Sequence, residues 1–234
     1  MIIPILMYHS INLQSSNHLT VSQKQFRQQI KHLSINYNIL SLDDIIHCKD
    51  FKKLTPESIV ISFDDSLKNN IDYALPILDE FKVKVVFFVV AGHLIGENRG
   101  DRKVIKDLKR MNEDDLDLLL SSGHTIGNHS LTHSYLPNLS DEMLEKEFIT
   151  SNHIIEENIG FKPQVFAYPY GDTDQRCLEL CRENFEYGFA TVKQGYFDWN
   201  IDPTNIRRIY VLPQDDAESL NYKISCYKQG KQHK

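Results

Sequence analysis

The feature that most constrains the fold of this chain is the alternation, from end to end, of short apolar runs with amphipathic stretches. The apolar runs that we predict as strands are residues 2–7, 39–42, 58–63, 83–90, 125–127, 165–168, 189–192 and 209–212. Alternating strands and helices form parallel sheets with crossover helices. Seven or eight strands in 234 residues predict an α/β fold with one barrel-like domain, since a (β/α) barrel needs ~250 residues.

The helices are predicted from capping signals and from the spacing of apolar residues. Ser22 precedes a stretch whose apolar residues recur at helical spacing, and residues 71–81 and 111–121 have the same character. Ser140 begins a long helix that Gly160 ends, because glycine accepts the left-handed conformation that terminates helices. Residues 174–184 form the next predicted helix.

The overall charge and the chain start exclude some classes of protein. A net charge of -6 argues against a nucleic-acid partner, which requires a basic surface. No run approaches the ~18 apolar residues of a membrane span. The N-terminus has no basic region and no small-residue cleavage site, so we expect a cytoplasmic protein. If a leader has been removed, a cell-surface or secreted location is expected instead.

Two adjacent carboxylates follow the strongest predicted strand. Asp64 and Asp65 come directly after residues 58–63, at the carboxyl end of a strand, where barrel folds place their chemistry. Such close like charges raise each other's pKa, and a cation would remove that cost. The alternative is that these aspartates only cap the following helix.

Two histidines four residues apart follow the predicted strand at 125–127. If the segment is helical, the imidazoles of His129 and His133 face the same way and can reach one ion. With the acidic pair, they predict a centre of two histidines and one carboxylate. These ligand types favour one divalent metal, Zn²⁺ first, with an open position for water; Ni²⁺, Co²⁺ and Mn²⁺ are alternatives.

Three further features are candidates for the same site. The turn at residues 168–171 (Tyr-Pro-Tyr-Gly) can direct a backbone N–H into the cleft as an oxyanion donor, or is only a turn with aromatic packing. His9 follows the first strand and can act as a general acid, because imidazole titrates near neutral pH. Trp199, the only tryptophan, can stack on a sugar ring or pack in the core.

The motifs Ser-Phe-Asp-Asp-Ser, His-Ser-Leu-Thr-His and Ala-Tyr-Pro-Tyr-Gly, in that order, resemble the first three motifs of the NodB-type polysaccharide deacetylase family. The resemblance covers most of the chain. The opening Leu-Met-Tyr-His-Ser is similar to the circularly permuted branch that contains the poly-N-acetylglucosamine deacetylases. It implies a distorted (β/α)₇ barrel, a single catalytic domain at residues 1–234 and one divalent metal.

The resemblance also implies a role for each residue. Asp64 would be the general base, beside three metal ligands, which would be Asp65, His129 and His133. The backbone N–H of Tyr170 would stabilise the oxyanion, and His9 would protonate the leaving amine.

The chain departs from the family pattern at two positions. Ala167 stands where the family usually has an arginine that orients the base, and Arg208 is the expected replacement, with Arg207 as the alternative. Ser66 stands where the family usually has glycine, which affects the expected turn more than the chemistry.

The function implied is a metal-dependent hydrolase that removes acetyl from an N-acetylated glycan, oligosaccharide or lipid- or nucleotide-linked sugar. We expect Tyr168, Pro169 and Trp199 to contact the substrate. One alternative is hydrolysis of another non-peptide C–N bond, such as that of a small cyclic amide. Another is a carbohydrate-binding protein without catalysis, against which the acidic base beside the ligands argues.

Overall fold

Eight parallel strands form one curled sheet in the computed structural model, which describes residues 2–48, 54–97, 105–191 and 194–232. The strands are β1 (Ile5–Tyr8), β4 (Asn38–Ile39), β5 (Ser58–Phe63), β6 (Val86–Val89), β7 (Thr125–Asn128), β8 (Val165–Ala167), β9 (Tyr187–Phe189) and β10 (Ile209–Tyr210). Seven of them follow the order β10-β1-β5-β6-β7-β8-β9, and β4 pairs with β5 outside this order. A smaller sheet pairs β2 (Ser10–Asn12) with β3 (Thr20–Ser22).

One segment touches both edges of the curled sheet. The N–H of Ile206 donates to the carbonyl of Gly188 in β9, and three residues later Ile209 pairs with Leu6 of β1. The sheet therefore bends far enough to close on itself through residues 206–210. This confirms the predicted α/β class and the distorted (β/α)₇ barrel.

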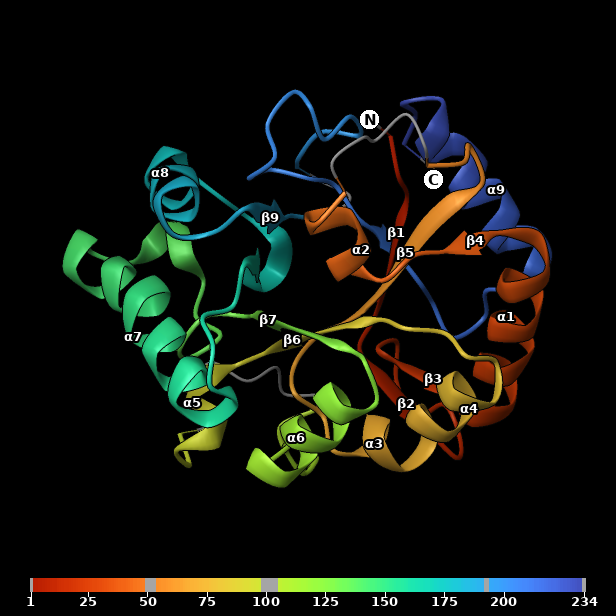
Figure 1. Ribbon diagram of the computed structural model, residues 1–234, viewed down its shortest axis with the longest axis horizontal. Coiled ribbons are helices and arrows are strands. Elements are labelled where there is room, and N and C mark those ends of the chain that lie inside the picture. The colour runs from red at the N-terminus through yellow and green to blue at the C-terminus, as the bar shows by residue number, and fades with distance from the viewer. Residues whose placement is uncertain (1, 49–53, 98–104, 192–193, 233–234) are drawn as a thin grey trace.

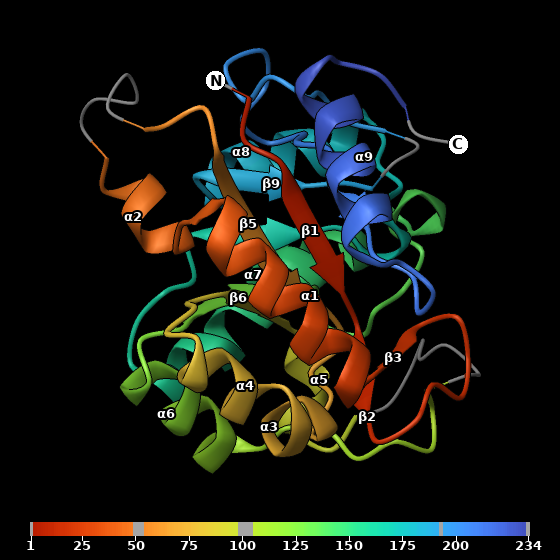
Figure 2. The same cartoon turned by 90° about the vertical axis from the view of Figure 1, so that its right-hand side faces the viewer.

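The helices lie around the outside of the sheet, except that α2 lies over its middle, where Leu42 and Ile45 pack against the interior side chains (Figure 1). They are α1 (Gln23–Asn36), α2 (Leu42–Ile46), α3 (Asn69–Tyr73), α4 (Leu75–Glu80), α5 (Ala91–Leu94), α6 (Glu113–Ser121), α7 (Asp141–Ile159), α8 (Gln175–Asn184) and α9 (Ala217–Lys228). Helices α7 and α8 flank one side, and α1 and α9 lie together on the side of β1 (Figure 2). No helix within the described residues combines the length and hydrophobicity needed to cross a bilayer.

The residues that we predicted as helix caps cap α1 and α7 in the structure. The side chains of Ser22 and Ser140 accept hydrogen bonds from the first turns of α1 and α7, and Gly160 ends α7 at φ 80°. The helix predicted over residues 71–81 is instead two short helices, α3 and α4, that meet at Ala74. Pro76 lies in the first turn of α4, where its missing N–H costs no helical hydrogen bond.

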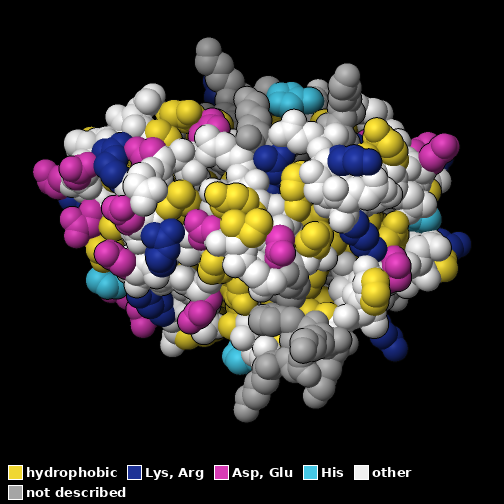
Figure 3. Space-filling model, turned by 90° about the horizontal axis from the view of Figure 1, so that it is seen from above, with side chains coloured by type: hydrophobic (Ala, Val, Ile, Leu, Met, Phe, Trp, Pro, Cys, Tyr) yellow, Lys and Arg dark blue, Asp and Glu magenta, His cyan; other side chains and the backbone are white. Residues whose placement is uncertain are grey.

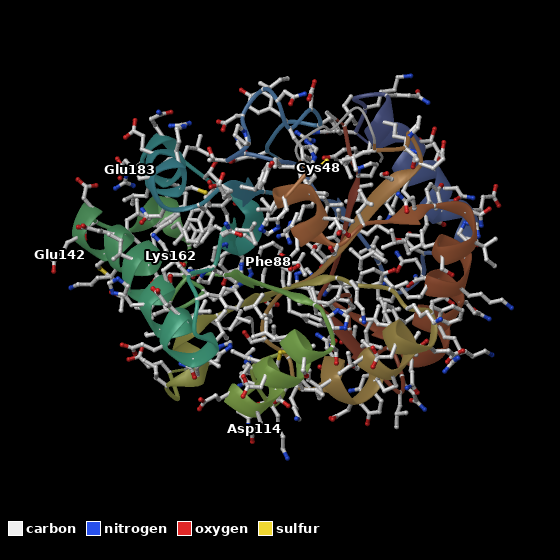
Figure 4. All side chains as sticks on the ribbon, in the orientation of Figure 1. Cys48, Phe88, Asp114, Glu142, Lys162 and Glu183 are labelled. Carbon is white, nitrogen blue, oxygen red and sulfur yellow. The ribbon has the colours of Figure 1, made fainter. Side chains whose placement is uncertain are left out.

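Alternation along the strands separates two packed regions. Val165 and Ala167 point into the barrel interior with Phe88, which Figure 4 labels near the middle of the molecule. Phe166 and Tyr168 point the other way and pack under α7 and α8. On the face seen from above, apolar side chains are interspersed with charged side chains of both signs (Figure 3).

Candidate metal centre and active site

Three predicted ligands converge at the carboxyl ends of β5 and β7. Oδ1 of Asp65 lies 3.5 Å from Nε2 of His129 and 3.1 Å from Nε2 of His133. One ligand atom from each residue lies within 4.8 Å of the other two, and all three side chains are buried. Tetrahedral zinc with bonds of ~2.0–2.1 Å would hold its ligand atoms roughly 3.3 Å apart. The spacing of the cluster therefore fits one small divalent cation.

The hydrogen bonding of these side chains also fits a cation. Within the described part of the chain, both carboxylate oxygens of Asp65 and both ring nitrogens of His133 are buried without a hydrogen-bond partner. Buried polar atoms are costly unless a partner or a metal satisfies them. Nδ1 of His129 lies 2.7 Å from the carbonyl oxygen of Ala167, so this nitrogen carries the proton and leaves Nε2 for a ligand.

Both aspartates are held in the ionised form. Burial raises the pKa of the Asp65 carboxyl, but the imidazoles of His133, His129 and His9 bring that pKa well below its ordinary value. Burial likewise raises the pKa of Asp64, and the guanidinium of Arg208, with the nearby imidazoles of His129 and His9, more than offsets it and lowers the pKa. His9 therefore acts on both carboxylates.

Arg208 binds Asp64 through a bidentate ion pair. Its two terminal nitrogens donate to Oδ1 and Oδ2 of Asp64 at 2.7 and 2.8 Å, and Nε donates to the carbonyl of Ala190. Arg208 is fully buried because it lies on the same side of the extended segment as Ile206, which faces the barrel interior. Arg207 points the other way, onto the ring of Phe197. The geometry thus pairs Arg208, of the two candidates, with the predicted base.

Left-handed backbone conformations gather at this site. Of the six non-glycine residues with positive φ among those described, five lie in the predicted motifs, namely Asp65, Ser66, Ser130, His133 and Tyr170. Such conformations are unfavourable and cluster at functional sites. The segment 129–133 is not helical, so the helix that would have aligned the two histidines is absent. The positive φ of Ser130 and His133 turns the backbone and brings the imidazoles together instead.

Ser66 adopts φ 52°, a conformation that glycine reaches more easily and that explains the usual family residue there. Its hydroxyl accepts a hydrogen bond of 2.7 Å from the N–H of Val90, directly after β6. The serine therefore adds a link between two strand ends that glycine could not form.

Tyr170 lies against the candidate metal centre. Its ring centroid is 4.8 Å from that of His133 and 6.1 Å from that of Tyr135. Tyr135 is exposed and was not among the predicted site residues. The signal that could have revealed it is its position two residues after His133 at the rim of the same loop.

The three predicted substrate contacts are all buried. Tyr168 is buried on the helix side of β8, and its hydroxyl donates to the carbonyl of Thr204. Trp199 is 2% exposed, packs against Phe189 and donates to the carbonyl of Ile3. Pro169 is buried at the start of a 3₁₀ turn. The structure gives these side chains packing contacts, so a role in substrate binding stays a prediction.

A cavity of about 700 Å³ lies elsewhere, at the amino ends of β8 and β9. It is lined by Phe161, Lys162, Arg182 and Glu183, among others, and by none of the predicted site residues. Lys162 and Glu183 are labelled in Figure 4. The predicted ligands, and not this cavity, therefore identify the candidate site, which lies at the carboxyl ends of the strands.

The chain is similar to known deacetylases in sequence. The family model described as polysaccharide deacetylase matches residues 51–187. The poly-beta-1,6-N-acetyl-D-glucosamine N-deacetylase of Staphylococcus aureus strain MSSA476 is 30% identical over 203 residues, which cover 85% of this chain and 69% of that protein.

Two solved structures share the fold. The deacetylase PplD of Streptococcus pyogenes, in complex with acetate, superposes with a TM-score of 0.82 at 22% identity, covering 96% of this chain and 98% of that one. IcaB from Ammonifex degensii superposes with a TM-score of 0.78 at 19% identity, covering 95% of this chain and 97% of that one.

Proposed function

We propose that this chain, since it belongs to the polysaccharide deacetylase family, is a metal-dependent de-N-acetylase that hydrolyses the acetamido group of an N-acetylated sugar. The family predicted from the motifs is thus confirmed, and the activity of this chain is the proposal. The observation that carries it is the buried cluster of Asp65, His129 and His133 beside Asp64, a second carboxylate paired with Arg208. We extend the proposal to residues 1–234 as one catalytic domain.

The ligand set would hold one divalent cation, with Zn²⁺ first among the candidates. A cation held by Asp65, His129 and His133 would act as a Lewis acid and lower the pKa of water. Its removal should therefore abolish the reaction.

The chain's own residues meet the remaining needs of amide hydrolysis. Asp64, ionised beside Arg208, takes the proton of the attacking water as the new C–O bond forms. The backbone N–H of Tyr170 donates to the oxygen that becomes negative in the tetrahedral intermediate, an interaction worth roughly 2.7–4 kcal/mol. His9 gives a proton to the amine as the C–N bond breaks, and acetate leaves.

An N-acetylated glucosamine is the substrate class that best fits the relatives. The name of the Staphylococcus aureus protein specifies a β-1,6-linked polymer of N-acetylglucosamine. In this chain the exposed ring of Tyr135, beside Tyr170 and His133, offers an aromatic surface next to the metal centre. Such a surface suits the apolar face of a sugar ring.

Acetate release from N-acetylglucosamine oligomers with added Zn²⁺ tests the proposal. Asp64→Asn should lower the rate by about a hundred- to ten-thousand-fold, because the neutral amide cannot accept the water proton. The metal content should stay that of the wild type, and the exposed Asp117→Asn on α6 is the matched control. Equal rates for wild type and Asp64→Asn would exclude Asp64 as the base.

Chelation separates catalysis from simple binding. A de-N-acetylase of this kind should lose activity on metal removal and regain it when Zn²⁺ is restored. If the wild type binds the oligomers and releases no acetate with any of the four metals, the carbohydrate-binding alternative would replace the proposal. Ring opening of a small cyclic amide to its amino acid, without any release of acetate from the oligomers, would instead favour the other C–N hydrolase.

A further inference from the structure

Glu147 is a buried carboxylate that the proposed reaction does not use. It lies on α7 and is 5% exposed, whereas Glu142 on the same helix points outward (Figure 4). Among the described residues, no lysine or arginine forms an ion pair with Glu147. A charge buried in this way is costly unless hydrogen bonds satisfy it. The partners of this carboxylate must therefore be other polar groups.

All the hydrogen bonds recorded for this carboxylate come from the loop between the two histidine ligands. Oε2 accepts from the backbone N–H groups of Leu131 and Thr132, both at 2.9 Å. Oε1 accepts from the hydroxyl of Thr132 at 2.5 Å. Hydrogen bonds to a charged acceptor are stronger than neutral ones. Glu147 thus binds the middle of the loop that starts at His129 and ends at His133.

The carbonyls of Ser130 and Leu131 accept hydrogen bonds from the first N–H groups of α5, but the N–H groups of the loop have few other partners. The N–H of His129 still bonds to β6, at the carbonyl of Val89. The N–H of Ser130 donates to the side chain of Asn128, and that of His133 donates to the hydroxyl of Ser130. Of the five N–H groups from 129 to 133, the two in the middle depend on Glu147 alone. It is also the one side chain outside residues 128–133 that these N–H groups use.

The loop needs such support because its backbone is unfavourable. Ser130 and His133 have φ of 68° and 56°, and conformations of this kind persist only where the surroundings enforce them. Helix α7 also binds the end of β7, just before the loop, since the side-chain amide of Asn128 donates to the side chains of Ser151 and Asn152. The same helix therefore anchors the loop at its start and at its middle.

We propose that Glu147 is a positioning residue of the metal centre, whose carboxylate holds the 129–133 loop in the shape that lets His129 and His133 bind one cation. The inference rests on the proposed metal-dependent function. It is separate from the ligand set, because Glu147 reaches the cation only through the loop that it binds. It adds to this site a carboxylate that lies outside the three motifs.

Metal affinity, measured by competition with a chromogenic chelator, tests this role without any substrate. Glu147→Ala should lower the affinity for Zn²⁺ by about 10- to 100-fold, as expected when a partner behind a ligand is lost. The absorption spectrum of the Co²⁺-loaded variant should change too, since it reports the geometry of the ligands. Glu147→Gln, which still offers one oxygen to the two N–H groups, should recover most of the affinity.

Glu145→Ala is the matched control, since Glu145 is exposed on the same helix. It should bind Zn²⁺ like the wild type. Wild-type affinity and an unchanged Co²⁺ spectrum in a folded Glu147→Ala protein would overturn the inference. If Glu147→Ala does not fold, Glu147→Asp decides in the same assay, with a loss of affinity supporting the role and wild-type affinity rejecting it. A wild type that binds no metal would instead refute the proposed function.

Discussion

At the scale of single residues, the pair of Asp64 and Arg208 shows how position along a strand selects between two neighbours. The residues at 207 and 208 are both arginines, but only the second lies on the interior side, in line with Ile206. Its guanidinium satisfies both oxygens of a carboxylate that would otherwise be buried without a counter-charge.

Replacing Arg208 should therefore affect both stability and rate. Arg208→Ala leaves Asp64 as an unpaired buried charge, and we expect the free energy of unfolding to fall by about 3–5 kcal/mol. Arg208→Lys should be intermediate, since lysine keeps the charge but cannot donate in bidentate geometry. Urea unfolding and acetate release are the measurements. Arg207→Ala is the control, and an equal effect of the two alanine variants would contradict the assignment.

The same alternation explains why the ring of Tyr168 is buried. The residues at 166 and 168 share the helix side of β8, whereas 165 and 167 share the interior. The Tyr-Pro-Tyr-Gly motif by itself indicated only a turn. The period of two along the strand, applied to Tyr168 itself, predicts that its ring packs under α7 and α8.

At the scale of secondary-structure elements, His124 joins two neighbouring strands just before β7. Its Nδ1 accepts a hydrogen bond from the N–H of Val85, which directly precedes β6. Burial, with the charge of Lys84, lowers the pKa of His124 to about 4. The folded protein thus keeps this imidazole neutral.

Stability should depend on pH through this residue. An unfolded histidine titrates near 6.5, so between pH 6.5 and about 4 the unfolded state binds more protons and stability falls as the pH falls. The full shift corresponds to about 3 kcal/mol. Urea unfolding at pH 7 and pH 5 should show a smaller loss for His124→Gln than for the wild type. The exposed His153→Gln should behave like the wild type, and identical losses in all three would refute the prediction.

Helix α7 carried a sequence signal whose meaning was missed. Leu144, Phe148 and Ile155 mark its buried side, and Glu147 lies on that same side. A carboxylate at a buried helical position needs partners. The helical period alone marks Glu147 as unusual, but it does not reveal that the partners are the backbone of the 129–133 loop.

At the scale of the whole molecule, the candidate metal centre joins side chains from strand ends that belong to separate parts of the sheet. Asp65 follows β5, and the two histidines follow β7, with β6 between them. Only the folded state brings these ligands together, so a cation at this site would bind the folded state alone. Its binding free energy would therefore add to the stability of the whole barrel.

Thermal unfolding should show this coupling. Zn²⁺ at ~100 times its dissociation constant should add ~2.7 kcal/mol, which is roughly 5–11 °C in melting temperature for a chain of this size. His133→Ala should lose most of this increment, and the exposed His18→Ala should keep it. An increment of the same size in all three proteins would indicate that Zn²⁺ binds elsewhere.

The sequence by itself determined the strand-helix alternation, the parallel barrel and the polar residues at the strand ends. These follow from local periodicity and residue type, and the motif order identified the family. Only the tertiary structure decided that Arg208 reaches Asp64, 144 residues away, that Trp199 packs in the core, and that Glu147 binds the histidine loop. These contacts depend on how far the sheet curls and how the loop backbone turns, which are properties of many residues together and not of any local pattern.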